Sequence, residues 1–144
     1  MKSGILISKL WFDVDIAELQ IRVSDGTSSF SNEIYVAHDT IEDAVSSLRV
    51  FRNHLNGGLL NLQFGEFGPE FAKGAFHARF HFLLPGRLFV TCNQESGFEE
   101  FANKKVASKA TLYVKSEPVL LDRFITQMEV LAASMRAEAE LEGI

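Results

Sequence analysis

Two histidines, His77 and His81, are the residues of this sequence whose spacing most resembles that of a metal-binding pair. On a helix, a separation of four residues would place both imidazoles on adjacent turns, where they could bind one zinc ion. The surrounding residues alternate between apolar and polar types, however, and this alternation predicts a strand from Phe76 to Phe82. Four strand residues span roughly 13 Å, which is too far for one shared ion. We therefore expect no metal site, and we interpret His77, Arg79 and His81 as a polar or partner-facing side of the strand.

Two carboxylates, Glu66 and Glu70, flank Gly68-Pro69 in a glycine-rich segment that predicts a loop from Gly65 to Gly74. Carboxylates held a few ångström apart can divide the roles of general acid and general base. Nothing in the sequence fixes that separation, and charged loop residues are usually solvated. We therefore favour a binding loop over a catalytic pair. The loop residues that we expect to meet a partner or ligand are Glu66, Phe67, Glu70 and Phe71.

Other catalytic patterns are absent from the sequence. Cys92 lies in an apolar alternating run with no Lys, Arg or His within three residues, so nothing local would lower the pKa of its thiol. No Gly-x-Ser-x-Gly motif occurs, and the glycine-bearing segments match neither a phosphate-binding loop nor the dinucleotide fingerprint. We therefore assign no catalytic residue and expect no cofactor.

Charge and composition narrow the class of partner. The chain carries 19 acidic and 14 basic residues, a net charge of −5, and its basic residues are scattered along the sequence. This pattern disfavours nucleic acid. The apolar start from Met1 to Ile7 is too short for a signal peptide or a membrane span. With a single cysteine as well, we expect a cytoplasmic protein that does not enter a membrane.

One strongly amphipathic helix is predicted from about Asp39 to His54. Asp39 and Glu42 resemble a capping box at its start, and Gly57-Gly58 is a typical stop signal. Its apolar stripe consists of Ile41, Ala44, Val45, Leu48, Phe51 and Leu55. The predicted helix must pack this stripe against another element.

The rest of the chain reads mainly as strands. A phase change near Asp13-Val14-Asp15 predicts a turn or bulge, and Asp25-Gly26 predicts the turn of a hairpin. A second helix is expected from Pro118, capped by Ser116 or Glu117, and its last residues should fray because Glu138, Glu140 and Glu142 disfavour a helix carboxyl end. Its buried stripe is predicted to contain Leu121, Phe124, Ile125, Met128, Leu131, Ala132 and Met135. The remaining predicted strands cover Leu60–Phe64, Phe76–Phe82, Leu88–Asn93 and Ala110–Val114.

These elements predict a single α+β domain over residues 1–144. We expect an antiparallel sheet of about six to seven strands with one central helix and one C-terminal helix. A chain of this length buries enough surface to fold without a disulfide or a metal.

The order of elements resembles that of small uncharacterised bacterial families, among them immunity proteins of polymorphic toxin systems of the WapI type. The likeness rests on that order, on the run from Leu60 to Glu70, and on a closing helix near Glu117-Pro118. It implies a cytoplasmic antidote that binds a toxin by its surface and catalyses nothing. It carries over no functional residue.

Our first hypothesis is therefore a non-catalytic protein-binding domain, an immunity-type or regulatory protein whose acidic surface meets a basic partner. The alternative is a small-molecule-binding or hydrolytic domain, with Glu66, Glu70, His77 and His81 lining a pocket between sheet and helices. We also expect a twofold homodimer, because the helical stripes cannot cover all the aromatic residues. The aromatic residues left over are Trp11, Phe12, Phe89 and Phe98.

Overall fold

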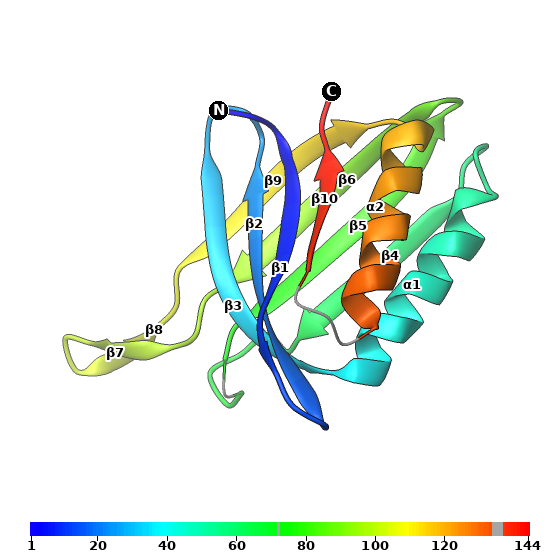
Figure 1. Ribbon diagram of the computed structural model, residues 1–144. Helices are drawn as coiled ribbons and strands as arrows, with labels where there is room; N and C mark the ends of the chain where they lie inside the picture. Colours follow the sequence, from blue (N-terminus) through cyan, green and yellow to red (C-terminus); the bar gives the residue numbers. More distant parts are fainter. Residues whose placement is uncertain (72, 134–136) are drawn as a thin grey trace.

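The computed structural model describes residues 1–71, 73–133 and 137–144. These residues form ten strands and two helices (Figure 1). The strands build two four-stranded antiparallel sheets and one two-stranded ribbon. The α+β class predicted from the sequence is confirmed, but the strands are divided between two main sheets.

The first sheet, called sheet A below, has the strand order β10-β1-β2-β3. Its strands are β1 (Gly4–Phe12), β2 (Ile16–Ser24), β3 (Ser29–Ala37) and β10 (Glu138–Glu142). Both predicted turns are present. Asp13 Oδ1 accepts hydrogen bonds from the N–H groups of Asp15 and Ile16, at 2.8 and 2.9 Å. Asp25 closes the β2–β3 hairpin in the same way.

The second sheet, sheet B, has the order β4-β5-β6-β9. Its strands are β4 (Leu59–Gly65), β5 (Ala75–Leu84), β6 (Arg87–Glu95) and β9 (Lys109–Ser116). Strand β5 has the predicted orientation, with Phe76, Phe80 and Phe82 buried and Arg79 exposed. Between β6 and β9 the chain forms the ribbon of β7 (Glu99–Phe101) and β8 (Lys104–Val106), which projects from the body in Figure 1.

The two helices bury the stripes that the sequence predicts. Helix α1 (His38–Arg52) buries Ile41, Ala44, Val45, Leu48 and Phe51, and helix α2 (Pro118–Ala132) buries Leu121, Phe124, Ile125, Met128 and Leu131. Leu55 and Ala132 are partly buried, and Met135 lies outside the described residues.

Neither helix has the predicted side-chain cap, although Glu117 occupies one of the two N-cap positions predicted for the second helix. Helix α1 starts one residue earlier than expected, with Ala37 at the N-cap position and no side-chain cap, so Asp39 lies inside the first turn. At α2 the N-cap residue is Glu117, again without a side-chain cap. Ser116 Oγ instead donates 2.7 Å to the Glu142 carbonyl, because the chain end passes beside it. Asp39 still stabilises α1, because its negative charge in the first turn interacts favourably with the helix dipole.

The prediction that the chain after the second helix is a frayed helix end is also wrong for residues 137–144, which the structure describes. Glu138–Glu142 form strand β10, which pairs with β1 in a register that joins Gly4 to Glu142 and Ser8 to Glu138. Ala139 and Leu141 are completely buried on the inner side of this strand. The three glutamates therefore alternate with core residues and do not sit at the end of a helix.

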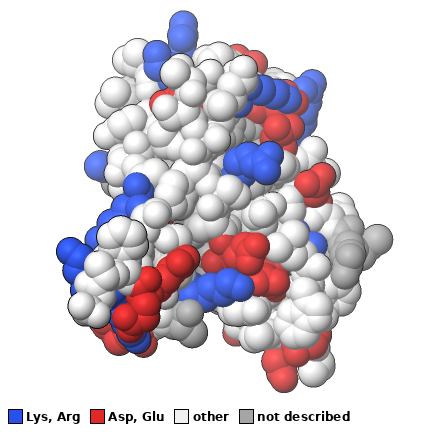
Figure 2. Space-filling view, turned by 90° about the vertical axis from the view of Figure 1, so that its left-hand side faces the viewer, with Lys and Arg blue, Asp and Glu red and all other residues white. Residues whose placement is uncertain are grey.

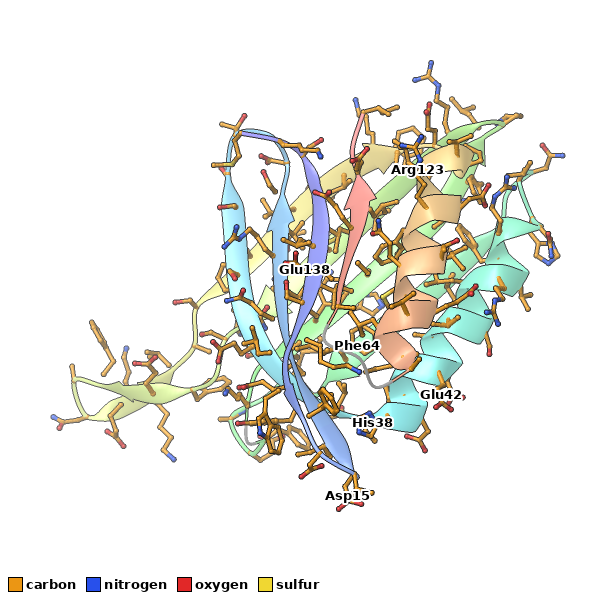
Figure 3. The ribbon with its side chains drawn as sticks, viewed as in Figure 1. Asp15, His38, Glu42, Phe64, Arg123 and Glu138 are labelled. Atoms are coloured by element: carbon orange, nitrogen blue, oxygen red, sulfur yellow. The ribbon has the colours of Figure 1, made fainter. Side chains whose placement is uncertain are left out.

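The core lies between the inner faces of the two sheets and the two helices, which pack together beside sheet A and in front of sheet B in Figure 1. Phe51 of α1 stacks on Phe82 of β5 with ring centroids 4.7 Å apart. Phe64 of β4, labelled in Figure 3, is 1 % exposed and lies inside this core, whereas Glu42 points away from α1. Strand β4 therefore contributes one face to the core and stands at the border of sheet B.

Candidate functional site at the border of sheet B

The three polar residues predicted on β5 lie on the outer face of sheet B, opposite the helices. Arg79 is exposed, and His77 and His81 are partly buried. His77 Nε2 lies 3.1 Å from Asn61 Oδ1 on the neighbouring strand β4. Because strand side chains alternate, the helices on the inner side cannot share a pocket with these histidines. They belong to an open surface.

The predicted loop lies at the end of sheet B and exposes its four candidate residues, Glu66, Phe67, Glu70 and Phe71. The loop is attached through its backbone: the N–H of Gly68 donates 3.0 Å to Glu95 Oε2. Glu66 lines a hollow with Tyr35, Val36 and Ala37, whereas Glu70 lies against Gly68. The two carboxylates therefore have different surroundings, and an assignment of the loop as a binding element stays a prediction.

Lys73 fixes the other end of this loop to sheet A. Its Nζ lies 2.6 Å from Glu18 Oε2 and 3.3 Å from Glu33 Oε2, and 4.6 Å from the centre of the Tyr35 ring. The hydrogen bond to Glu18 raises the pKa of Lys73 above its ordinary value. Acidic and basic side chains also lie next to one another in the lower half of the face seen in Figure 2. The loop base is therefore a structural junction of the two sheets.

Residues for covalent or metal chemistry are not gathered in the described part of the chain. Cys92 is completely buried, and burial raises the pKa of its thiol to about 12, so the reactive thiolate is disfavoured. No three His, Cys, Asp or Glu side chains among residues 1–71, 73–133 and 137–144 are arranged to hold a metal ion. Within the same ranges, no helix is long and apolar enough to cross a membrane.

A groove runs between helix α1 and strand β4. It consists of three hollows of about 550, 200 and 280 Å³. Ser47 lines both the first and the second hollow, and Thr40 and Gln63 line both the second and the third. The hollows therefore form a continuous row that starts beside His54 and ends beside Glu66.

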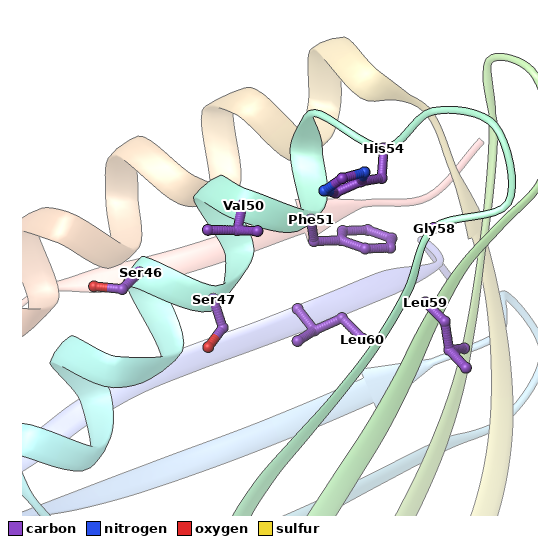
Figure 4. A pocket seen from close by; sticks show the side chains of 8 residues that line it. All are labelled: Ser46, Ser47, Val50, Phe51, His54, Gly58, Leu59 and Leu60. Atoms are coloured by element: carbon purple, nitrogen blue, oxygen red, sulfur yellow. The ribbon is translucent and has the colours of Figure 1, made fainter.

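The largest of these three hollows lies at the carboxyl end of α1. Figure 4 shows Phe51 extending from α1 toward Gly58, and Leu60 extending from β4 toward the helix. Val50 and Leu59, which complete the apolar part of the lining, are 62 % and 50 % exposed. This end of the groove is an open apolar depression with polar groups at its border from Ser46, Ser47 and His54.

The helix wall of the groove is a second face of α1 that the sequence analysis missed. Its residues recur three and four positions apart: Thr40, Asp43, Ser47 and Val50, with His54 just beyond the end of the helix. Such spacing places them on one side of the helix, next to the buried stripe. Most of these side chains are short, so the helix leaves space beside β4. The same spacing is visible in the sequence, but small and polar residues do not distinguish a groove from ordinary solvated surface.

Strand β4 is the last strand of sheet B on this side, so one row of its backbone groups has no strand partner among residues 1–71, 73–133 and 137–144. The N–H of Phe82 donates 3.0 Å to the Gly58 carbonyl, which makes residues 58 and 82 a hydrogen-bonded pair. Bonded and non-bonded pairs alternate along an antiparallel ladder. Residues Leu60, Leu62 and Phe64 therefore bond to β5, and the N–H and C=O groups of Leu59, Asn61 and Gln63 point away from the sheet.

Two further contacts fix the same register across sheet B. The N–H of Ser96 donates to Ser108 O at 2.9 Å. The backbone groups of the even-numbered residues in β6 therefore bond to strand β9, and those of the odd-numbered residues bond to strand β5. On the opposite border of the sheet, the N–H of Ile144 donates to Lys115 O at 2.9 Å. The backbone N–H and C=O groups of the odd-numbered residues in β9 therefore point away from the sheet. The free row on β4 therefore follows from the register of the whole sheet.

Comparison of this chain with protein-family models, with curated proteins and with solved structures finds no match. The resemblance to immunity proteins of toxin systems therefore stays a prediction. What the chain does must be argued from the groove, the free row of backbone groups and the charges around them.

Proposed function

We propose that this protein is a non-catalytic protein-binding domain, of the immunity or regulatory kind, that holds an extended segment of its partner as an additional strand beside β4. The observation that carries the proposal is the free backbone row of Leu59, Asn61 and Gln63 facing the groove along α1. Addition of a strand to an open sheet border is a recurring mode of peptide recognition, in which main-chain hydrogen bonds supply affinity and pockets select side chains.

The dimensions of the site support an extended occupant. Strand β4 has seven residues, and a strand of that length spans roughly 23 Å at about 3.3 Å per residue. The part of α1 that lines the groove runs from Thr40 to Phe51 alongside it, and a helix rises about 1.5 Å per residue, so it spans roughly 17 Å. A bound strand would therefore meet the helix wall over most of its length. The net charge of −5 would accelerate its encounter with a basic partner.

A display library of random peptides, selected on the full immobilised chain, tests this proposal. We expect enriched peptides that slow hydrogen exchange at the amides of Leu59, Asn61 and Gln63 when they bind. In the free chain these amides should exchange faster than those of Leu60, Leu62 and Phe64, which bond to β5.

Asn61→Pro provides a sharper readout, because it removes an outward N–H and leaves the ladder to β5 intact. Loss of one backbone hydrogen bond of about 1 kcal/mol should weaken peptide binding roughly fivefold. Thr111→Pro is the matched control, since it removes an outward N–H from β9 on the opposite border. Equal binding by both variants, or selection of peptides that leave β4 exchange unchanged, would contradict the proposal. Enrichment of small molecules but no peptide at the 550 Å³ hollow would favour the ligand-binding alternative.

A further inference from the structure

We infer that the groove is selective for an extended segment with one bulky apolar residue and one Lys or Arg four positions apart. This inference rests on the proposed function and names the chemistry of the segment. The apolar residue would occupy the hollow beside Val50 and Leu60, and the basic residue would lie at the opposite end, between Asp43 and Glu66.

The acidic end carries two exposed carboxylates. Asp43 lines the second hollow and Glu66 lines the third, and both side chains are exposed. The ion pairs found among residues 1–71, 73–133 and 137–144 involve neither of them. A Lys or Arg from a bound segment would supply the missing opposite charge, and an acidic residue would be repelled.

The apolar end provides a different kind of contact. Val50 and Leu59 are exposed around a floor formed by Phe51 and Leu60 (Figure 4). A Leu, Ile or aromatic side chain placed there would remove apolar surface from water on both sides. The polar groups of this hollow, from Ser46, Ser47 and His54, carry no carboxylate that would attract a cation. The two ends therefore select different residues.

The spacing follows from strand geometry. The apolar hollow is lined on this side by residues 58–60, and the two hollows that hold Asp43 and Glu66 are lined by residues 61–66, so their centres lie between four and five residues apart along the chain. A strand lying beside β4 has the same rise per residue, and its alternate side chains point to the same side. Residues four apart would thus both face the helix, whereas residues three or five apart would not.

Short dye-labelled peptides test the selectivity directly. The probes are Ser-Thr-Leu-Thr-Ser-Thr-Lys-Thr-Ser and its reversed order, because the groove can accept either strand direction. Matched probes carry Glu in place of Lys, or Ser in place of Leu. By fluorescence anisotropy, we expect one Leu-and-Lys peptide to bind at least about fivefold more tightly than each of its substituted forms.

Two charge-reversal variants separate the site from the overall charge. Asp43→Lys with Glu66→Lys should invert the preference, so that the Glu peptide binds more tightly than the Lys peptide. The control, Asp15→Lys with Glu42→Lys, changes the net charge equally at exposed positions that do not line the groove; both residues are labelled in Figure 3. If the control inverts the preference as well, the acidic end has no specific role and the inference is overturned.

The apolar end has its own pair of variants. Val50→Asp should weaken binding of the Leu peptide roughly fivefold and leave binding of the Ser peptide unchanged. Val119→Asp, on the exposed side of α2, should change the binding of neither peptide. If all peptides bind equally but Asn61→Pro still weakens them, the selectivity is overturned and the proposed function stands. If no peptide binds, both are overturned.

A second copy of the chain is the competing occupant. Two β4 strands could pair and join two copies of sheet B, which would meet the expectation of a twofold dimer. Sedimentation over a wide concentration range distinguishes this outcome. A dimer that Asn61→Pro dissociates, and that excludes the peptides, would overturn the peptide inference.

Discussion

The side-chain amide of Gln94 donates a hydrogen bond to Asn32 Oδ1 across 2.8 Å and thereby joins sheet B to sheet A inside the core. Asn32 in turn donates to the carbonyls of Ala75 and Glu95, at 3.2 and 3.0 Å. Both amide side chains are buried, at 6 % exposure for Asn32 and 2 % for Gln94. A buried polar group is costly without a partner, so these contacts fix how the two sheets face one another.

Replacing Asn32 by Ala should therefore lower the free energy of unfolding by about 2–3 kcal/mol, since it leaves the Gln94 amide with fewer partners in the core. Urea denaturation measures the change. Asn93→Ala, one residue away from Gln94 but on the outer face, should cost less than about 1 kcal/mol. Equal losses for the two variants would show that the contact between the sheets contributes nothing specific.

Leu141→Ala should destabilise the chain by about 2–4 kcal/mol, because Leu141 is completely buried in strand β10. Glu140→Ala on the other side of the same strand should have a small effect. Thermal melting of both variants distinguishes this strand from a frayed helix end, for which neither substitution would matter.

Cys92 should resist thiol reagents at pH 8 in the folded chain and react completely in urea, because burial raises the pKa of its thiol to about 12. The raised pKa also determines how the stability of the fold depends on pH. The unfolded thiol ionises near its ordinary pKa of about 9 while the folded thiol stays protonated, so stability should fall as pH rises from about 9 toward 12. Cys92→Ala should lack this part of the slope, and rapid labelling of the folded chain would contradict the burial.

Lys73→Met should cost about 1 kcal/mol at neutral pH, because it removes the partly buried contacts with Glu18 and Glu33. The pKa of Lys73 is raised in the folded chain, so its contribution is complete below its ordinary pKa of about 10.5 and is lost as pH rises further. The stability difference between wild type and variant should narrow above that pH in urea titrations. Lys105→Met on the exposed ribbon is the control. If its stability has the same pH profile as that of Lys73→Met, the contacts of Lys73 with Glu18 and Glu33 have no specific effect.

The local sequence pattern was sufficient to predict elements that bury one side and expose the other. The alternation of β5 predicts which of Phe80 and Arg79 is buried, and the spacing of three and four residues predicts the stripe of α1. The turns at Asp13 and Asp25 follow in the same way, because each carboxylate bonds to backbone groups two and three residues later.

Pairing between distant segments could not be predicted. Strand β10 reads as Glu-Ala-Glu-Leu-Glu, a composition that favours a helix, and only its contact with β1 makes it a strand. The division into two sheets depends on similar long-range choices. The groove was missed for a related reason: short residues such as Thr40 and Ser47 gain meaning only from the strand that lies opposite them.

The pairing of Gly4 with Glu142 also sets an order of events during synthesis. Strand β1 emerges from the ribosome long before β10, which borders it on the side away from β2. Until then one side of β1 is open to pairing with other nascent chains, and the contact that closes it must join segments that are far apart in the sequence. We therefore expect sheet A to be completed late in folding, and chaperones that shield open strands should raise the yield of this protein without contributing to its final stability.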